Sequence, residues 1–438
     1  MSHQYSKVIL KAGKERSLQN FHPWLFSGAI NKIEGEVKEG DIVEIYSANN
    51  SYLATGHYHK GSITVRIFSF NQIEINYDFW KNSLQRAYNR RKLLGFTYNK
   101  ETNVYRLINA EGDDLPGLII DIYNQTAVIQ THILGMYNIR EDLSKALQEI
   151  YGGKLKAVFD KSAETMSKQG EINAANTYLF GDKGDTMVVE NGLKFKIDWE
   201  EGQKTGFFID QRDNRKLLGE LAEDKTVLNA FAYSGGFSVY ALDGGARLVH
   251  SVDSSKKAMM IADLNVRNNF PDEIGGKHRI NNQNDNEGEN EIADWSDVPA
   301  EKHPLSSNDK SQQYLNHECF AEDVFDYLKN MEPIYDLIIL DPPAFAKHLS
   351  SIDKATIGYR NLNFEALRKM KSGSILFTFS CSQVIDKQLF RKIVFMAATQ
   401  ARKKVRILYQ LTQPSDHPIS IYHPEGEYLK GLVLLVED

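Results

Sequence analysis

Two short apolar runs, residues 335–340 and 374–379, constrain the fold of this chain most strongly. Each is bounded by turn-forming or polar residues and has the length of a buried strand, and the connection between them has room for a helix. Parallel strands joined by helices form a doubly wound sheet, which binds ligands beyond the carboxyl ends of its strands. Asp341 follows the first run and Cys381 the second. We therefore expect a carboxylate and a thiol to share one site.

A similar strand–turn–helix unit lies upstream of these runs. Residues 226–231 form a predicted strand that leads into a turn with Gly235 and Gly236, and a helix follows. Glycine lets the backbone approach a ligand closely at the N-terminus of a helix. The next predicted strand, residues 247–253, ends in Asp253, about 20 residues beyond the turn, a spacing suited to binding ribose hydroxyls.

Absent motifs narrow the class of ligand. The sequence contains neither the dinucleotide fingerprint GxGxxG nor the phosphate loop GxxxxGK[ST], so it fits neither a dehydrogenase nor a phosphoryl transferase. Asp323 ends a third predicted strand, residues 318–323. Together with Asp253 it suits a ligand that has a ribose and an adenine but no pyrophosphate. S-adenosylmethionine fits that description.

Residues 1–75 consist of short β-rich segments separated by turns, which predicts a small barrel of a kind that often binds RNA. The run 21–28 places aromatic residues beside basic ones, a pattern suited to stacking on unpaired bases. For Trp24 or Phe26 alone, a place in the barrel core is the favoured interpretation. Residues 1–100 carry 14 Lys and Arg against 8 Asp and Glu, so a polyanion contact is expected at this end of the chain.

The remainder divides into a central α+β domain, residues 76–190, and the doubly wound domain, residues 191–438. In the central domain, Arg86 and Arg90 lie on the basic face of a predicted helix, where phosphate contact and simple solvation explain them equally well. In the doubly wound domain, residues 201–212 suit either a loop that covers a ligand or a plain strand-to-helix connection.

Composition excludes several classes of protein. Only Cys319 and Cys381 occur, which excludes a disulfide framework and a four-cysteine zinc site, so we predict no metal. Cys319 lies within a predicted strand, before its acidic end, and is expected to be buried in the core. No apolar stretch reaches about 18 residues and no export signal is apparent, so a cytoplasmic protein without membrane contact is expected. Residues 271–313 carry 10 Asp and Glu against 4 Lys and Arg, with little apolar periodicity, and are predicted to be a flexible acidic insertion.

Several motifs together resemble one family. Asn229-Ala-Phe-Ala-Tyr-Ser-Gly-Gly, Asp341-Pro-Pro-Ala-Phe and Ser380-Cys-Ser are similar to motifs of the class I S-adenosylmethionine-dependent methyltransferases. More narrowly, the chain resembles the bacterial large-subunit rRNA cytosine-C5 methyltransferases, which carry an N-terminal PUA domain. Supporting stretches are residues 21–30, 106–121 and 202–212. The sequence departs from the pattern at Asn229, where many methyltransferases have an acid, and in the long 271–313 insertion.

This resemblance implies a PUA-like barrel, a central α+β domain and a Rossmann-like methyltransferase domain that binds S-adenosylmethionine. Asp253 would bind the ribose, Asp323 would bind the adenine edge, and the loop at 202–212 would close over the cofactor. The expected cofactor contacts are Phe207, Asp210, Gln211, Asn229, Phe231, Tyr233, Gly235, Asp253, Ser254, Asp323, Asp341 and Pro342. The expected RNA contacts are Lys14, Arg16, Trp24, Arg86 and Arg90.

The resemblance also implies that Cys381 is a nucleophile. Covalent addition at C6 makes C5 of cytosine reactive, and the thiolate that adds needs a pKa lowered by its surroundings. Asp341 would hold the N3/N4 edge of the base and favour protonation there. The sequence does not identify the base that removes the C5 proton.

Two other functions stay open at this point. Asp-Pro-Pro with the nearby Phe345 also suits a methyltransferase acting on an exocyclic base nitrogen, which needs no thiol. A non-catalytic RNA-binding assembly factor that retained the fold is the third hypothesis. The partner expected in each case is large-subunit rRNA, and the resemblance is compatible with a homodimer.

Overall fold

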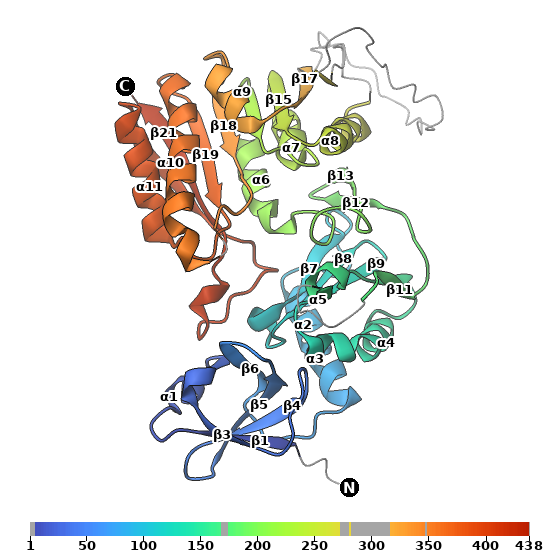
Figure 1. Ribbon diagram of the computed structural model, residues 1–438. Helices are drawn as coiled ribbons and strands as arrows, with labels where there is room; N and C mark the ends of the chain where they lie inside the picture. The colour runs from blue at the N-terminus through green and yellow to red at the C-terminus, as the bar shows by residue number, and fades with distance from the viewer. Residues whose placement is uncertain (1–4, 168–173, 272–279, 282–315, 347, 438) are drawn as a thin grey trace.

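The computed structural model describes residues 5–167, 174–271, 280–281, 316–346 and 348–437. In this part of the chain, an N-terminal sheet of six strands is followed by a central sheet of five strands, a two-stranded hairpin and a C-terminal sheet of eight strands. Figure 1 shows the N-terminal and C-terminal sheets at opposite ends of the molecule, with the central body between and beside them. Among the described residues, no helix has both the length and the apolar character needed to cross a bilayer.

The N-terminal sheet has the order β2-β6-β5-β4-β1-β3. Val8, Val43 and Val65 are fully buried in its core, as expected of β-branched residues on the inner face of a sheet. Register shifts in several of its strand pairs curl the sheet, and this PUA-like body confirms the predicted small barrel. The elements are β1 Ser6–Leu10, α1 Arg16–Gln19, β2 Trp24–Phe26, β3 Ile30–Glu34, β4 Ile42–Tyr46, β5 Tyr52–Tyr58 and β6 Ile63–Ser69.

The central body begins with helix α2 (Tyr77–Leu93), which Asn76 caps by accepting a hydrogen bond from the N–H of Phe79. Its apolar face, with Trp80 and Leu84, packs into the core formed with a sheet of order β11-β10-β9-β8-β7. The remaining elements are β7 Val104–Asn109, β8 Leu118–Tyr123, β9 Thr126–Thr131, α3 Leu134–Asn138, α4 Arg140–Tyr151, β10 Ala157–Asp160, α5 Ala163–Ser167 and β11 Thr177–Phe180.

The C-terminal sheet has the order β16-β17-β15-β14-β18-β19-β21-β20. The first six strands run parallel, and β21 runs antiparallel to both β19 and β20. Strand order reverses between β14 and β18, the switch point of a doubly wound fold. The predicted Rossmann-like architecture is therefore confirmed. Most of the predicted acidic insertion, residues 271–313, lies outside the described residues.

After a short initial hairpin, helices and strands alternate in this domain from α6 to β16 and again from β17 to β20. They are β12 Met187–Glu190, β13 Leu193–Lys196, α6 Arg212–Glu220, β14 Thr226–Ala230, α7 Gly236–Asp243, β15 Leu248–Asp253, α8 Lys256–Asn269, β16 Ile280–Asn281, β17 Asn316–Ala321, α9 Val324–Asn330, β18 Leu337–Leu340, α10 Ile352–Lys369, β19 Ile375–Ser380, α11 Lys387–Gln400, β20 Lys404–Leu411 and β21 Lys430–Glu437.

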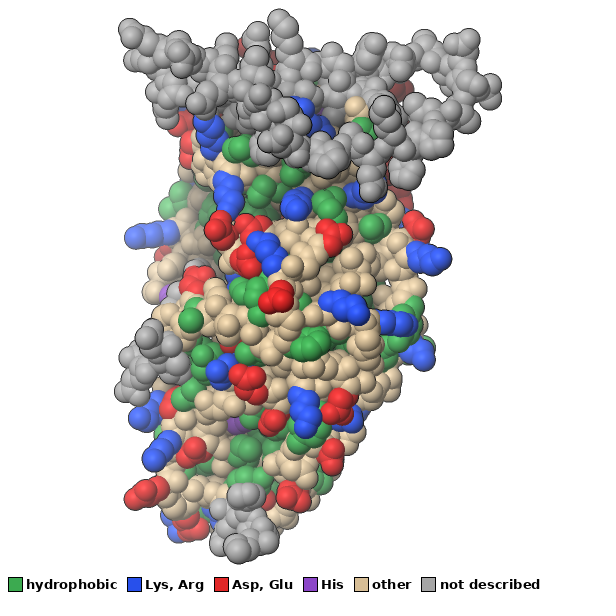
Figure 2. Space-filling view, turned by 90° about the vertical axis from the view of Figure 1, so that its right-hand side faces the viewer, with side chains coloured by type: hydrophobic (Ala, Val, Ile, Leu, Met, Phe, Trp, Pro, Cys, Tyr) green, Lys and Arg blue, Asp and Glu red, His purple; other side chains and the backbone are tan. Residues whose placement is uncertain are grey.

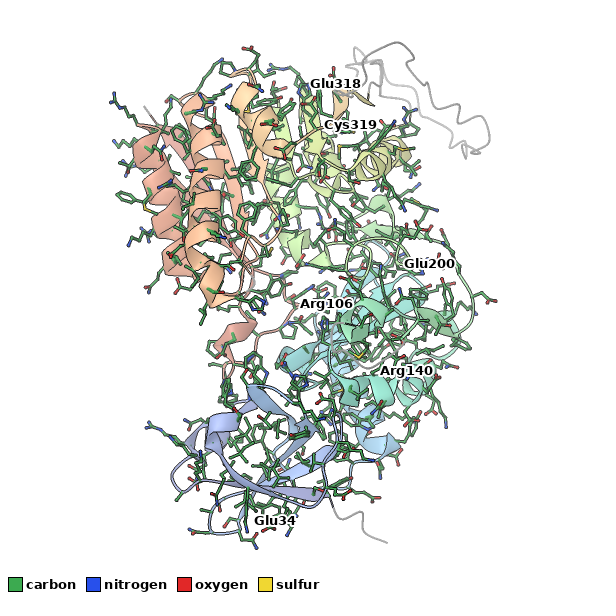
Figure 3. The ribbon with its side chains drawn as sticks, viewed as in Figure 1. Glu34, Arg106, Arg140, Glu200, Glu318 and Cys319 are labelled. Atoms are coloured by element: carbon green, nitrogen blue, oxygen red, sulfur yellow. The ribbon has the colours of Figure 1, made fainter. Side chains whose placement is uncertain are left out.

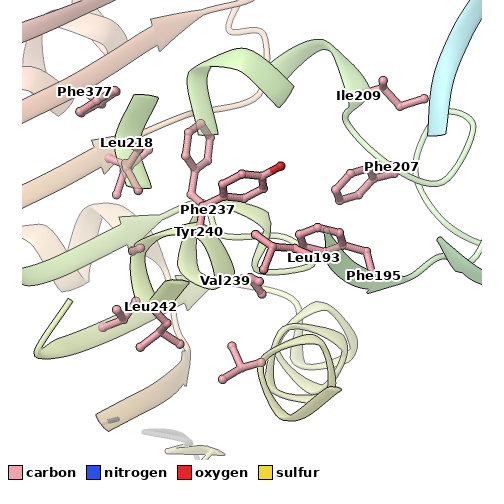
Figure 4. Packing of buried hydrophobic residues seen from close by; sticks show 14 of the residues in the cluster. Leu193, Phe195, Phe207, Ile209, Leu218, Phe237, Val239, Tyr240, Leu242 and Phe377 are labelled. Atoms are coloured by element: carbon pink, nitrogen blue, oxygen red, sulfur yellow. The ribbon is translucent and has the colours of Figure 1, made fainter. Parts of the chain in front are cut away.

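A hairpin turn and an aromatic cluster fix the entry into this domain. Asn191 and Gly192 have φ angles of 50° and 84°, as a tight turn between β12 and β13 requires. Phe195 of β13 then packs 5.1 Å from Phe207 and 6.3 Å from Tyr240 of α7, measured between ring centroids (Figure 4). The hairpin and the loop after it are therefore anchored on the first helix of the doubly wound unit.

Residues 412–429, which connect β20 to β21, are called the strap below. Figure 1 shows this segment leaving the C-terminal sheet towards the N-terminal body. The fully buried Asp416 accepts hydrogen bonds on Oδ2 from the Arg212 side chain and from the main-chain N–H of Arg106, both at 2.9 Å. Its main-chain oxygen accepts a hydrogen bond from Arg91 of α2 at 2.8 Å. Figure 3 labels Arg106 where the central body faces the C-terminal domain.

The far end of the strap reaches the N-terminal sheet. The ring of His423 packs 4.4 Å from that of Trp24, and Tyr422 packs 5.3 Å from Phe21. The strap therefore contacts all three bodies, although its two ends belong to the C-terminal sheet.

Asp416→Ala is expected to lower the free energy of unfolding by roughly 3 kcal/mol, because it leaves Arg212 buried without its closest carboxylate. Urea denaturation followed by circular dichroism measures this change. Glu437→Ala is the control, since its pair with Arg406 is solvent-exposed and should contribute less than about 1 kcal/mol. Equal losses in the two variants would contradict a special role for Asp416.

Candidate functional site

The carboxyl ends of the parallel strands bring the predicted site residues to one edge of the sheet. Asp253 ends β15, Asp341 follows β18 and Cys381 follows β19. Because β18 and β19 are paired in register, with Leu340 opposite Thr378, the residues that follow them remain close. The Cys381 Sγ lies 3.9 Å from the main-chain oxygen of Pro342.

Cys381 is partly buried beside two carboxylates and two amines. The pKa of its thiol is raised to about 11, chiefly by burial and also by the charges of Asp341 and Asp210, while the charges of Lys204 and Lys430 act in the opposite direction. The sulfur and the Asp341 carboxyl therefore interact electrostatically. Cys319 is only 3% exposed in β17, as expected for a core cysteine, and Figure 3 shows it away from the domain junction at Arg106.

Asp341 and Asp210 have strongly different proton affinities. The pKa of Asp341 is raised to about 7, chiefly by burial and also by the charge of Asp210, whereas a hydrogen bond from Gln211 acts to lower it. Burial acts in the same direction on Asp210, but Lys204, His417 and the hydroxyl of Tyr428, which donates at 2.8 Å, hold the pKa of Asp210 at about 2. Near neutral pH the site thus combines a fixed anion with a carboxyl group that can donate a proton.

Backbone amides orient the carboxylate of Asp253. Its Oδ2 accepts from the N–H of Tyr233 at 3.0 Å and its Oδ1 from that of Ser255 at 2.9 Å. The Tyr233 hydroxyl accepts from the N–H of Gln203 at 3.1 Å and its ring packs 5.2 Å from Phe208. These contacts hold the 202–212 loop over the turn that follows β14.

That turn is built for close packing. Gly235 has a φ of 75°, and a Cβ there would lie 2.8 Å from the Cβ of Ala262 on α8. Phe231 also has a positive φ, of 63°, and its ring meets Phe325 at 6.3 Å between centroids. Asp323 is exposed, and its Oδ1 accepts from the N–H groups of Phe325 and Asp326 at the start of α9. Two carboxylates held by amides on adjacent strands, next to exposed Ser254, form a donor set that fits an adenosine-bearing cofactor.

Two expected cofactor contacts lie inside the hydrophobic core. Phe207 is 4% exposed, with the Arg215 guanidinium 4.6 Å above its ring. Asn229 is 1% exposed and its Nδ2 donates to the Ser238 hydroxyl at 2.8 Å. The neighbouring Phe208 is the partly exposed aromatic residue of the loop.

The expected RNA contacts are spread over two bodies. Lys14, Arg16 and Arg86 are exposed. Arg90 donates to Asp113 at 2.8 Å, and the indole N–H of Trp24 donates to Glu111 at 2.7 Å. Trp24 and Arg90 therefore already have partners within the protein.

Three residues that no sequence pattern indicated also border the group of Asp210, Asp341 and Cys381: Lys204, Tyr428 and Lys430. Tyr428 belongs to the strap and Lys430 begins β21, so their place at the site depends on the antiparallel return of the chain. A local sequence pattern cannot predict that these two residues lie at the site, because their position depends on how distant parts of the chain pair.

Comparisons with known proteins agree with this geometry. Residues 8–70 match a family described as a PUA-like domain, and residues 155–278 match an S-adenosylmethionine-dependent methyltransferase family. The ribosomal RNA large subunit methyltransferase I of Tolumonas auensis is 36% identical, with 98% of both chains covered. The protein of the same name from Alteromonas mediterranea is 35% identical over 99% of both chains.

The chain belongs to the ribosomal RNA large subunit methyltransferase I family. It is an S-adenosylmethionine-dependent methyltransferase with a PUA-like domain. A Streptococcus mutans structure described as such a methyltransferase shares the fold, with a TM-score of 0.75, 22% identity, and coverage of 98% of this chain and 100% of that one. A methyltransferase solved in complex with SAH gives a TM-score of 0.76, 23% identity and the same coverage.

Asp341→Asn is expected to accelerate alkylation of Cys381 by iodoacetamide at pH 8. At that pH Asp341, with a pKa of about 7, is mostly ionised, and its charge raises the pKa of the thiol. Removing the charge lowers the thiol pKa and should increase the rate about threefold to tenfold, which corresponds to roughly half to one pKa unit. The measurement uses a Cys319→Ser background.

At about pH 5.5 the carboxyl of Asp341 is protonated in the parent, so the two rates should converge. A rate difference that is independent of pH would show that the substitution acts through structure and not through charge.

Proposed function

We propose that this methyltransferase forms 5-methylcytosine in large-subunit rRNA through a covalent bond between Cys381 and C6 of the base. The observation that carries the proposal is the pairing of the Cys381 thiol with the Asp341 carboxyl, whose pKa is about 7, at the edge of a methyltransferase sheet. The choice of rRNA rests on the names of the curated relatives.

The chemistry of cytosine explains why both groups are needed. C5 is a weak nucleophile until a thiolate adds at C6 and the ring accepts a proton at N3. Cys381 supplies the sulfur, and the neutral form of Asp341 donates the proton to N3. The enamine formed in this way carries electron density at C5.

S-adenosylmethionine, when bound, supplies the methyl group to C5. Asp253 and Asp323 hold its ribose and adenine, and Phe208 and Tyr233 shield the same edge of the sheet from water. A water molecule accepts the C5 proton, the C6–S bond then breaks and the thiolate leaves, while N3 returns its proton to Asp341. The aromatic ring is restored and Cys381 is free for another turnover.

RNA would approach across the junction of the strap and the N-terminal sheet. Phe21 (49% exposed), Phe26 (46%) and Tyr422 (52%) present rings there, although large apolar side chains are usually buried. The exposed Lys14 and Arg16 belong to the same N-terminal body. Unpaired bases stack on such rings. On the face shown in Figure 2, basic and acidic side chains of the described residues are interspersed, so this face does not present one broad basic surface.

Covalent trapping tests the catalytic proposal. Incubation with S-adenosylmethionine and rRNA containing 5-fluorocytidine should give a denaturant-stable adduct at Cys381, because fluorine at C5 blocks the final elimination. Mass spectrometry of the digested complex identifies the attached peptide. Cys381→Ala should abolish both the adduct and turnover, and Cys319→Ala should retain both.

Methylation that survives Cys381→Ala would instead favour transfer to an exocyclic nitrogen, which needs no thiol. A complete lack of S-adenosylmethionine binding in calorimetry would favour a non-catalytic assembly factor. Either result would overturn the cytosine-C5 proposal.

Phe21→Ala and Tyr422→Ala should each weaken binding of an rRNA fragment roughly tenfold, since stacking of one base contributes about 1–3 kcal/mol. Filter binding or fluorescence anisotropy measures the affinity. Phe395→Ala, which removes a ring that is 65% exposed on α11, is the matched control and should leave affinity unchanged. Equal effects at all three positions would argue against a specific stacking surface.

A further inference from the structure

The proposed mechanism requires a thiolate, yet most of the environment of Cys381 disfavours one. Burial and the charges of Asp341 and Asp210 all raise the pKa of the thiol. Two cations oppose them, Lys204 and Lys430. Lys204 is exposed on the 202–212 loop, whereas Lys430 is only 3% exposed. Lys204 has the larger effect on the thiol pKa, but it is exposed and pairs with Asp210. Lys430 is buried, where solvent screens a charge less, and its ammonium has a fixed position, so it is the cation that the fold itself holds at the sulfur.

Main-chain carbonyl groups hold the ammonium of Lys430 in place. Lys430 is the first residue of β21 and lies opposite Ser380, the last residue of β19 and the neighbour of Cys381. Its Nζ donates to the main-chain oxygen of Ser382 at 2.6 Å and to that of Tyr428 at 2.7 Å. One side chain thus bonds the turn that contains Cys381 and also bonds the end of the strap.

The turn has little freedom to move away from this contact. The hydroxyl of Ser382 accepts from the N–H of Ala346 at 3.3 Å and lies 2.9 Å from the hydroxyl of Tyr359. Ser380 and Ser382 are both fully buried. The ammonium of Lys430 and the sulfur of Cys381 are consequently positioned by the paired strands β21 and β19.

We propose that Lys430 is the positioning residue that makes Cys381 competent as a nucleophile. Its fixed ammonium stabilises the thiolate, and its two hydrogen bonds hold the Ser380–Ser382 turn against β21. The inference rests on the proposed role of Cys381 as nucleophile. It assigns a task to a buried charge that the methyl-transfer steps described above do not otherwise use.

The charges around Lys430 define the pH range of the effect. The pKa of Lys430 is lowered to about 8, chiefly by burial and also by the charge of Lys387, while Cys381, Asp386 and Glu427 act to raise it. These groups come from the β19 turn, the start of α11 and the strap. Because a depressed pKa means that the ammonium is lost as pH rises through about 8, its effect on the thiol is strongest below pH 8.

Alkylation of Cys381 by iodoacetamide tests this without RNA or cofactor, so its outcome is independent of whether cytosine C5 is the target. All variants carry Cys319→Ser, and rates are measured from pH 6 to pH 10. Lys430→Gln keeps a hydrogen-bond donor but removes the charge, and Lys430→Met removes both. Both should react about threefold to tenfold more slowly than the parent below pH 8, and the difference should shrink above it.

Lys369→Gln is the matched control, since this lysine also donates to a main-chain carbonyl, that of Met331, but lies at the C-terminal end of α10. It should leave the alkylation profile unchanged. Lys430→Arg keeps the charge and should recover part of the rate. A Lys430→Gln protein that is folded but reacts at the parent rate would overturn the proposal, as would an equal decrease in Lys369→Gln.

If the neutral variants do not fold, an Asp341→Asn protein with Lys430 intact decides the question, because the carboxyl of Asp341, with a pKa of about 7, otherwise also changes the thiol reactivity in this pH range. Two coupled groups give a thiol reactivity profile that departs from a single ionisation near pH 8. A profile with one simple ionisation and no inflection in that range would show that Lys430 does not act on Cys381.

Discussion

The buried carboxylate of Asp416 is the interaction on which the arrangement of this enzyme depends. A charge removed from water is tolerated only when it is paired and hydrogen-bonded, and Asp416 satisfies this with the side chain of Arg212 and the main-chain N–H of Arg106. Arg212 begins α6, directly after the loop that carries Asp210 and Gln211. The same contact that joins the central and C-terminal bodies therefore also fixes the start of the cofactor-side loop.

The chemistry of the site depends on the different pKa values of two neighbouring carboxyl groups, those of Asp341 and Asp210. Burial acts to raise the pKa of Asp341, of Asp210 and of Cys381 alike. Neighbouring charges and hydrogen bonds make the resulting pKa values of the two carboxyl groups differ. Asp210 has a cation and a tyrosine hydroxyl close by and stays ionised, whereas Asp341 faces that anion and retains a proton near neutral pH. A methyltransferase that must donate a proton and then take it back benefits from such a pair.

Local signals made much of this structure predictable. Helices α8 and α9 begin at local signals that the sequence carries, since Ser255 and Asp323 cap them with side chains that accept from nearby N–H groups. The placement of Asp341 and Cys381 at strand ends followed from apolar runs of strand length. The strap was not predictable, since the bond between Arg91 and Asp416 joins residues 325 positions apart. Phe207 and Phe208 were indistinguishable because tertiary packing alone decides which adjacent ring is buried.

The route of the strap has a consequence for protein engineering. Its two ends belong to the Rossmann-like half, while its middle rests against aromatic rings of the PUA-like half, so the boundary between modules in the sequence is not a boundary in space. Excision of the N-terminal module would remove the rings that pack on His423 and Tyr422. The strap, which continues directly into Lys430, would then lose its contacts at that end. A different RNA-binding module cannot simply be grafted in its place, because the catalytic half supplies part of the surface that receives it.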